Sequence, residues 1–148
     1  MSGAPVFVDT NLLLYLRDSR DSDKQRAAAE WMTGLWRTRR GRLSTQVLAE
    51  YYVTVTGKLD PGLSVEEARE DVLALQRWLP RHPSIDLIER AWDVQDRWGF
   101  SFRDASIVGA AIAEGCAALL TEDLSHDQDL AGLRILDPFA ASPADVFG

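Results

Sequence analysis

The sequence predicts an α/β protein whose parallel sheet is covered by helices on both faces. Short apolar runs alternate with longer amphipathic segments along the chain, and this alternation is typical of strands joined by crossover helices. The length of 148 residues fits a single domain, and a hydrophobic content of 46% is enough for a packed core. We therefore expect one domain over residues 1–148.

The first third of the chain predicts a strand, a short helix and a long helix. Residues 6–8, Val-Phe-Val, are a β-branched and aromatic run typical of a buried strand. Asp9 ends this run, and residues 12–16 predict a short helix. Ser22 begins the pattern Ser-Asp-Lys-Gln, which resembles a capping box, and it predicts a long helix to about residue 40. The apolar residues of that helix recur at helical spacing, at Ala28, Trp31, Met32, Leu35 and Trp36.

The middle of the chain predicts three helices and two weak strands. Residues 43–45 form the first weak strand. The helix after it ends near residue 57 and has its apolar positions at Val47, Leu48, Tyr51, Tyr52 and Val55. A further helix covers residues 64–79 and stops before a proline. Residues 85–87 predict a short strand, and residues 88–98 predict a helix that stops at a glycine.

The last third predicts a buried helix and two strands. A capping pattern that starts at Ser101 opens a helix over residues 105–114, which is apolar nearly all round and rich in Ala and Gly. Residues 117–121 and 133–136 predict the final two strands. An acidic loop, residues 122–129, lies between them.

The composition limits the classes of function. The formal net charge is −7, from 23 acidic and 16 basic residues, which counts against a protein that binds RNA over its whole surface. No apolar run reaches the roughly 20 residues needed to span a bilayer, so we expect no membrane contact. Residues 1–5 lack a basic stretch followed by a long apolar segment, so we expect no secretory signal. Cys116 is the only cysteine of the sequence and can form no intramolecular disulfide. We expect a cytoplasmic protein with Cys116 in the core.

Four acidic residues are candidates for a cation site. Asp9 and Asp123 directly follow predicted strands, and open α/β sheets bind ligands at the carboxyl ends of their strands. Asp104 lies in the first turn of a buried helix, and Glu50 lies within the helix that ends near residue 57. Carboxylate oxygens suit a hard divalent cation such as Mg²⁺, which can polarise a phosphoryl oxygen and activate water.

Each acid also has an alternative structural role. Asp9 could cap the helix that it precedes, and Asp104 could complete a capping box with Ser101. Asp123 could be a turn residue, and Glu50 a half-exposed helix residue. The pattern of the residues alone does not show that the four meet in space.

Four segments together resemble the PIN-domain family, and within it the VapC-type toxin ribonucleases. They run in the family's order, and with the end of the chain the likeness spans nearly the whole sequence. The segments are Val8-Asp9-Thr10-Asn11-Leu12-Leu13-Leu14-Tyr15, Gln46-Val47-Leu48-Ala49-Glu50-Tyr51-Tyr52, Ser101-Phe102-Arg103-Asp104-Ala105-Ser106-Ile107-Val108, and Gly115-Cys116 through Leu120-Thr121-Glu122-Asp123-Leu124.

The resemblance implies a PIN-like three-layer fold with a five-stranded parallel sheet flanked by helices. It implies a Mg²⁺ or Mn²⁺ site, with Asp9, Asp104 and Asp123 as ligands and Glu50 as a fourth catalytic acid. It further implies endonucleolytic cleavage of RNA, a small antitoxin protein as partner and a homodimer.

The resemblance leaves several details open. It matches Asn11 and Ser101 to positions that support the acids. The number of metal ions, the RNA target and a contribution from Asp127 in the acidic loop stay open.

Other functions receive less support. A phosphatase with an aspartyl nucleophile needs a second Asp two residues after the first, where Asn11 stands. Neither a GxGxxG pattern nor a Walker loop occurs, and the acidic loop lacks the glycine of an EF-hand. The alternative from another class is a PIN-like module that binds RNA or protein without cutting. The basic run with arginines at Arg37, Arg39, Arg40 and Arg42 fits either a solvated helix end or a contact with the RNA backbone.

Overall fold

The fold is built on a five-stranded sheet, which the computed structural model describes within residues 3–147. The order of the strands across the sheet is β2-β1-β3-β5-β4. Their bounds are β1 Val6–Val8, β2 Gly41–Arg42, β3 Ala118–Leu120, β4 Asp129–Leu130 and β5 Leu133–Leu136. The first four strands in this order pair in parallel, and β4 pairs with β5 in the antiparallel direction. The predicted α/β class with a five-stranded sheet flanked by helices is confirmed, and the sheet is parallel as predicted except at β4.

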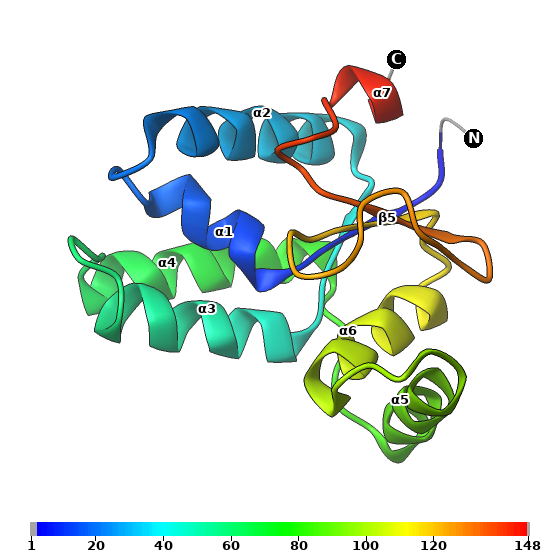
Figure 1. The fold of residues 1–148 in the computed structure, drawn as a ribbon. Helices are drawn as coiled ribbons and strands as arrows, with labels where there is room; N and C mark the ends of the chain where they lie inside the picture. The colour runs from blue at the N-terminus through cyan, green and yellow to red at the C-terminus, as the bar shows by residue number, and fades with distance from the viewer. Residues whose placement is uncertain (1–2, 148) are drawn as a thin grey trace.

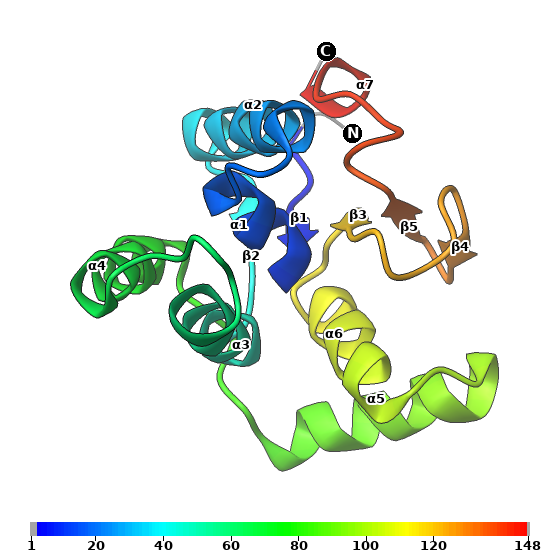
Figure 2. The same cartoon turned by 60° about the vertical axis from the view of Figure 1, so that its left-hand side comes forward.

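Helices cover both faces of the sheet, which makes three layers. Figures 1 and 2 show α2 and α7 on one side of the sheet and α3, α5 and α6 on the other. The helices are α1 Thr10–Arg17, α2 Ser22–Thr38, α3 Thr45–Gly57, α4 Val65–Leu75, α5 Ile85–Trp98, α6 Phe102–Ala113 and α7 Ala144–Phe147, and α4 continues into a 3₁₀ turn, Gln76–Trp78.

The core lies around the central strands, and the carboxyl ends of β1 and β3 lie at the same height in the sheet. All three residues of β1 are completely buried. In the register of β1 and β3, Val8 pairs with Leu120, so the residues that follow these two strands emerge side by side. The backbone amide of Asp9 donates to the carbonyl of Leu120 over 3.1 Å, which extends this pairing by one step. The predicted burial of Cys116 is also confirmed.

Two predicted strands are not where the sequence placed them. Residues 85–87 begin α5, because the Ser84 hydroxyl accepts a hydrogen bond from the Leu87 amide and caps the helix. The second strand is β2 rather than residues 43–45, and Ser44 instead caps α3 by accepting from the Val47 amide. In both cases a serine at a helix start decides the local conformation.

Smaller differences concern the ends of helices and the short elements. Asp21, not Ser22, caps α2, because its side chain accepts from the Lys24 amide. That helix ends at Thr38, since Arg39 adopts a left-handed conformation. The short elements β4 and α7 were not predicted. Within residues 3–147, no helix has the length and apolar character that crossing a bilayer requires.

Candidate active site

Four elements bring the candidate acids to the carboxyl edge of the sheet. Asp9 follows β1 and caps α1, and Asp123 lies in the loop after β3. Glu50 projects from α3, and Asp104 lies in the first turn of α6. Figure 2 shows the start of α1 between α3 and α6, which is why residues from these three helices can meet.

The four acids meet around one guanidinium group, that of Arg103. Its Nη2 lies 2.6 Å from Oε1 of Glu50 and 2.8 Å from Oδ1 of Asp9. Its Nη1 lies 3.2 Å from Oδ1 of Asp104 and 3.8 Å from Oδ2 of Asp123. The structure therefore brings all four candidate acids together, although the sequence analysis gave Arg103 no role.

Asp9 is the most deeply buried of the four acids, and both its oxygens are fully used. Its side chain is only 3% exposed. Oδ1 accepts from the Thr10 amide and from Arg103, while Oδ2 accepts from the Thr121 hydroxyl and again from Arg103. A buried carboxylate needs such partners because its loss of hydration costs several kcal/mol. The proposed capping role of Asp9 therefore holds together with its place in the acidic cluster.

Glu50 is held in its ionised form by its neighbours. Burial raises the pKa of Glu50, but hydrogen bonds from Arg103 and Thr10 outweigh this and leave the pKa below its ordinary value. The Thr10 hydroxyl donates to Oε1 over 2.8 Å. Thr10 thus connects the first turn of α1 with α3, a role that sequence analysis missed.

Asp123 is the most exposed of the four acids and has a different electrostatic character. Partial burial raises the pKa of Asp123, and the charge of Asp9 raises it further. The Asn11 amide donates to its Oδ2 over 3.3 Å and to the Thr121 hydroxyl over 3.2 Å. Oδ1 of Asn11 is buried and accepts no hydrogen bond from residues 3–147, so the site contains a polar oxygen still able to bind a donor or a cation.

The start of α6 holds Asp104 without using its side chain as a cap. The Ser101 hydroxyl accepts from the Asp104 backbone amide over 3.1 Å, and the Asp104 carboxylate accepts from Arg103 instead. Ser101 therefore supports Asp104 by fixing the helix start. A sequence signal for Arg103 was present, because a cation in the first turn of a helix opposes the helix dipole and requires another reason to be there.

The donor set fits a hard divalent cation, although the side chains do not yet form a ligand cluster. Four carboxylates face one point, and oxygen is the ligand that Mg²⁺ and Mn²⁺ prefer. As the side chains lie, no three acidic, histidine or cysteine residues within 3–147 are grouped closely enough to hold a metal ion. The Arg103 guanidinium lies between the four carboxylates. It therefore draws them toward one point and also keeps them too far apart to hold a metal ion together.

Asp127 lies outside this cluster. Its carboxylate faces Nε2 of His126 at 3.6 Å and Nη1 of Arg134 at 4.0 Å. Among the described residues these are its two ion-pair partners, and neither of them pairs with any of the four acids. The extra carboxylate that the acidic loop was considered able to supply is thus not part of the cluster as it stands.

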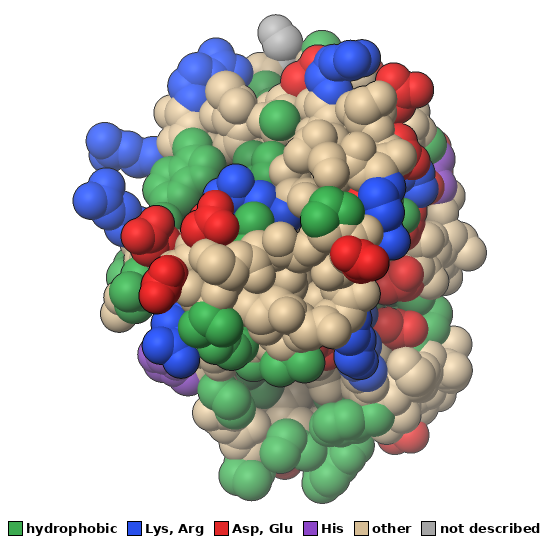
Figure 3. All heavy atoms as spheres, turned by 90° about the vertical axis from the view of Figure 1, so that its left-hand side faces the viewer, with side chains coloured by type: hydrophobic (Ala, Val, Ile, Leu, Met, Phe, Trp, Pro, Cys, Tyr) green, Lys and Arg blue, Asp and Glu red, His purple; other side chains and the backbone are tan. Residues whose placement is uncertain are grey.

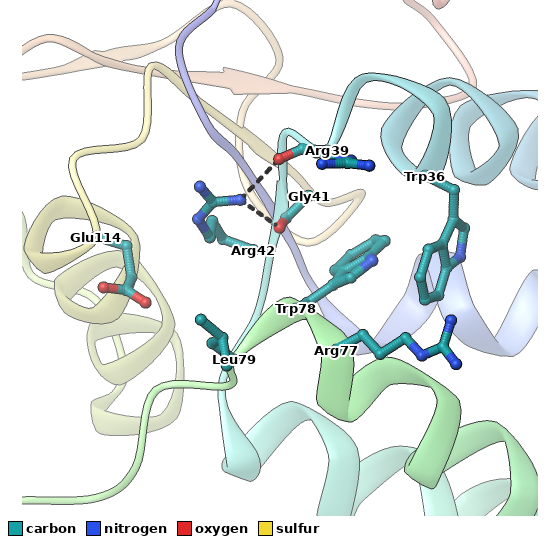
Figure 4. A pocket seen from close by; sticks show the side chains of 8 residues that line it. All are labelled: Trp36, Arg39, Gly41, Arg42, Arg77, Trp78, Leu79 and Glu114. Atoms are coloured by element: carbon teal, nitrogen blue, oxygen red, sulfur yellow. Dashed lines mark hydrogen bonds between the residues drawn. The ribbon is translucent and has the colours of Figure 1, made fainter.

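A second region with a distinct character lies at the amino end of β2. A cavity of about 610 Å³ opens there, and Figure 4 shows the residues around it: Trp36, Arg39, Gly41, Arg42, Arg77, Trp78, Leu79 and Glu114. The two tryptophan rings meet with their centroids 5.3 Å apart. The single acid, Glu114, pairs with Arg81 at 3.3 Å. We call this region the basic pocket.

The predicted basic run does not act as one unit. Arg37 lies in the last turn of α2, as a solvated helix end would. Arg39 and Arg42 line the basic pocket. Arg40 is buried, and its guanidinium donates to the backbone carbonyls of Ala4 and Val146. Arg40 is therefore a structural residue and is not available to RNA.

Charges of both signs are mixed over the surface elsewhere. Figure 3 shows one face of the molecule, on which acidic and basic side chains are interspersed and hydrophobic side chains gather at the lower end. No region of a single sign covers that face. This agrees with the expectation from the net charge that the surface does not bind RNA everywhere.

Comparisons with known proteins place this geometry in a family. The family model described as the PIN domain matches residues 6–129. A toxin–antitoxin complex from Klebsiella pneumoniae contains a chain of similar fold, with a TM-score of 0.62 and 18% identity over 90% of this chain and 97% of that chain. No curated protein matches the sequence significantly.

Two further solved structures share the fold. One is VapC20 of Mycobacterium tuberculosis, described as a toxin that cleaves the sarcin–ricin loop, with a TM-score of 0.54 and 22% identity over 80% of this chain and 89% of that chain. The other is VapBC2 of Rickettsia felis bound to a DNA fragment of its promoter, with a TM-score of 0.55 and 16% identity over 88% of this chain and 96% of that chain. At these identities the likeness is one of fold.

Proposed function

We propose a hydrolytic function on the premise that the family match supplies: the chain belongs to the PIN domain family. On that premise the protein is an endoribonuclease that depends on Mg²⁺ or Mn²⁺. Its catalytic acids are Asp9, Glu50, Asp104 and Asp123. The observation that carries this proposal is the convergence of these four carboxylates, from four separate elements, on one positively charged point.

Three of the acids would hold the cation. Asp9, Asp104 and Asp123 supply carboxylate oxygens, and Asn11 fixes the orientation of Asp123. When bound, a divalent cation neutralises charge on a phosphoryl oxygen and lowers the pKa of a water ligand. Glu50 completes the acidic set and is kept ionised by Arg103 and Thr10. Thr121 holds Asp9 by a hydrogen bond of 2.8 Å.

We further propose that the protein is the toxin of a VapBC-type pair in the cytoplasm. Of the three structures named above, one is described as a toxin–antitoxin complex, one as a toxin and one as VapBC2, and the first and the third match nearly the full length of both chains. The cognate partner would be a small antitoxin protein, and the toxin would form a homodimer. Trp36 is partly exposed and can contribute to a partner surface, whereas Trp31 is fully buried and cannot.

The nuclease proposal is tested by incubating the purified protein with total cellular RNA in EDTA, Mg²⁺ or Mn²⁺. We expect specific fragments only with a divalent cation, and we expect their 5′ ends to map to few sites. A protein that binds RNA but yields no fragments under any of these conditions would instead be the non-cutting PIN-like module.

The toxin proposal is tested separately, by co-expression with the small protein encoded next to the gene. We expect a complex on gel filtration and relief of growth inhibition. If neither is seen, the toxin assignment fails while the nuclease assignment stands.

A further inference from the structure

Arg103 occupies the one point that all four acids face, and it uses its whole hydrogen-bonding capacity there. A guanidinium has five N–H donors. Nε donates to Glu50, and the two terminal nitrogens donate to Asp9, Glu50, Asp104 and the Thr10 hydroxyl. The donors are therefore directed at the acids and at a residue that holds one of them.

The position of Arg103 in the chain is unfavourable unless the acids need it. It lies in the first turn of α6, where a positive charge opposes the helix dipole. Its side chain is 33% exposed, so it gives up part of its hydration as well. Hydrogen bonds with Glu50 and Asp9 more than offset that loss, and they raise the pKa of Arg103 above its ordinary value.

A divalent cation cannot bind Asp9 while these contacts persist. Each Asp9 oxygen already accepts one hydrogen bond from the chain around it and one from Arg103. The Thr10 and Thr121 donors belong to the fold at this point, whereas the Arg103 head group stands at the end of a flexible side chain. Arg103 is thus the partner that a cation would replace.

We propose that Arg103 is a positioning residue that holds the place of the divalent cation. Its guanidinium gathers Asp9, Glu50, Asp104 and Asp123 while no cation is bound, and it leaves them when a cation binds. Arg103 thereby sets the cation affinity of the site. This inference rests on the proposed function for the nature of the ligand, and on the contacts above for the competition.

A placeholder arginine and a merely structural arginine differ in what their removal should do. Removing a structural arginine would weaken both the fold and the cation site. Removing a placeholder should weaken the cation-free fold but strengthen cation binding, because the competing charge is gone. The two measurements should therefore move in opposite directions.

The test compares Arg103→Gln with Arg103→Lys and wild type. Arg134→Gln is the matched control, because the exposed Asp127 is the only ion-pair partner of Arg134 within residues 3–147. Mn²⁺ affinity is measured by calorimetry, and the melting temperature is measured in EDTA. We expect Arg103→Gln to melt lower in EDTA and to bind Mn²⁺ about tenfold or more tightly. Arg103→Lys keeps the charge, so its melting temperature and Mn²⁺ affinity should lie closer to those of wild type. Arg134→Gln should match wild type in both measurements.

A second measurement uses wild-type protein and does not depend on a variant that folds. The ¹⁵N side-chain signal of Arg103 Nε is followed by NMR during titration with Mg²⁺. We expect its chemical shift to move away from the value of a hydrogen-bonded Nε as the cation binds.

Equal or weaker Mn²⁺ binding by a folded Arg103→Gln overturns the inference, as does an Arg103 signal that Mg²⁺ leaves unchanged at saturation. If the opposite shifts occur but the protein cuts no RNA, the inference stands and the nuclease proposal fails. If cation-dependent cleavage occurs without those shifts, only the inference fails.

Discussion

The acidic cluster lies beyond the carboxyl ends of β1 and β3, whereas the basic pocket lies beside the edge strand β2, and the two regions differ in their charges. In the cluster, four acids share Arg103, and each of them contacts it. In the basic pocket, Arg39, Arg42 and Arg77 have no acid within salt-bridge distance among residues 3–147, since Glu114 pairs with Arg81. Each acid of the cluster thus has a cationic partner within the chain, whereas the arginines of the pocket have no acidic partner and present their charge to solvent. Chemistry is expected from the first region and at most ligand contact from the second.

The sharpest test of this division is Asp9→Asn. The amide removes the most buried charge of the cluster, and with it a proposed cation ligand and a partner of Arg103. We expect RNA cleavage to fall by about a hundredfold or more, because losing a metal ligand costs several kcal/mol of barrier. Asp127→Asn, in the acidic loop but outside the cluster, should keep its activity. Similar rates for the two variants would remove Asp9 from the site.

The substitution Gly41→Ala should disturb the packing of the basic pocket and leave the acidic cluster unchanged. A β-carbon at position 41 would lie 2.5 Å from the Trp78 ring, which is buried and packs against Trp36. The ring must move, and we expect a loss of about 1–3 kcal/mol in the free energy of unfolding, measured in urea. Gly57→Ala, whose β-carbon would meet nothing within 4 Å, is the control. If Gly41→Ala were as stable as wild type, the Trp78 ring would be able to move aside at no cost in stability.

A contact between the basic pocket and RNA should have a modest effect. We expect the double variant Arg39→Gln/Arg77→Gln, made in the Asp9→Asn background so that RNA is not cut, to bind RNA less than about tenfold more weakly. The slope of affinity against salt should fall by about one to two. Arg40 is excluded from this test because it supports the fold. Arg97→Gln/Arg134→Gln is the control, and complete loss of binding would show that the pocket is a principal RNA site.

The smallest expected effect is a change in melting temperature when Asp123 loses its charge. The folded-state pKa of Asp123 is raised, so the protonated form favours folding, and that advantage is lost as the pH rises through the folded-state pKa. In EDTA at pH 7, Asp123→Asn should therefore melt higher than wild type by on the order of one or two degrees. The difference should vanish in acid, where Asp123 is protonated. Asp93→Asn, on the exposed side of α5, is the control for the change from acid to amide.

Much of the fold could be predicted because the apolar runs are local signals. The strands around residues 6–8, 117–121 and 133–136 were found within one residue of their ends, since buried parallel strands are continuous apolar segments. Residues 85–87 were predicted wrongly because apolar residues at a capped helix start look like a short strand. The two-residue strand β4 depends on pairing with β5, which no local pattern encodes.

The candidate site could be predicted only in part, for a related reason. The four acids were selected from strand ends, helix positions and the family resemblance, and the structure brings them together. Arg103 was missed because its role depends on the distance between α6 and α3, which is a property of the fold. Thr10 and Thr121 were missed in the same way, since a hydroxyl beside an acid has no distinctive spacing.

The guanidinium among the acids also bears on how the protein is made. Arg103 and Asp104 are neighbours in the chain, so a countercharge for the cluster is synthesised together with it. If Arg103 serves as the countercharge of the four acids, a newly made molecule can reach its folded shape in a medium poor in free divalent ions. If the proposed exchange operates, biosynthesis and the onset of activity are separate events, and the second is governed by the supply of ions rather than by completion of the fold.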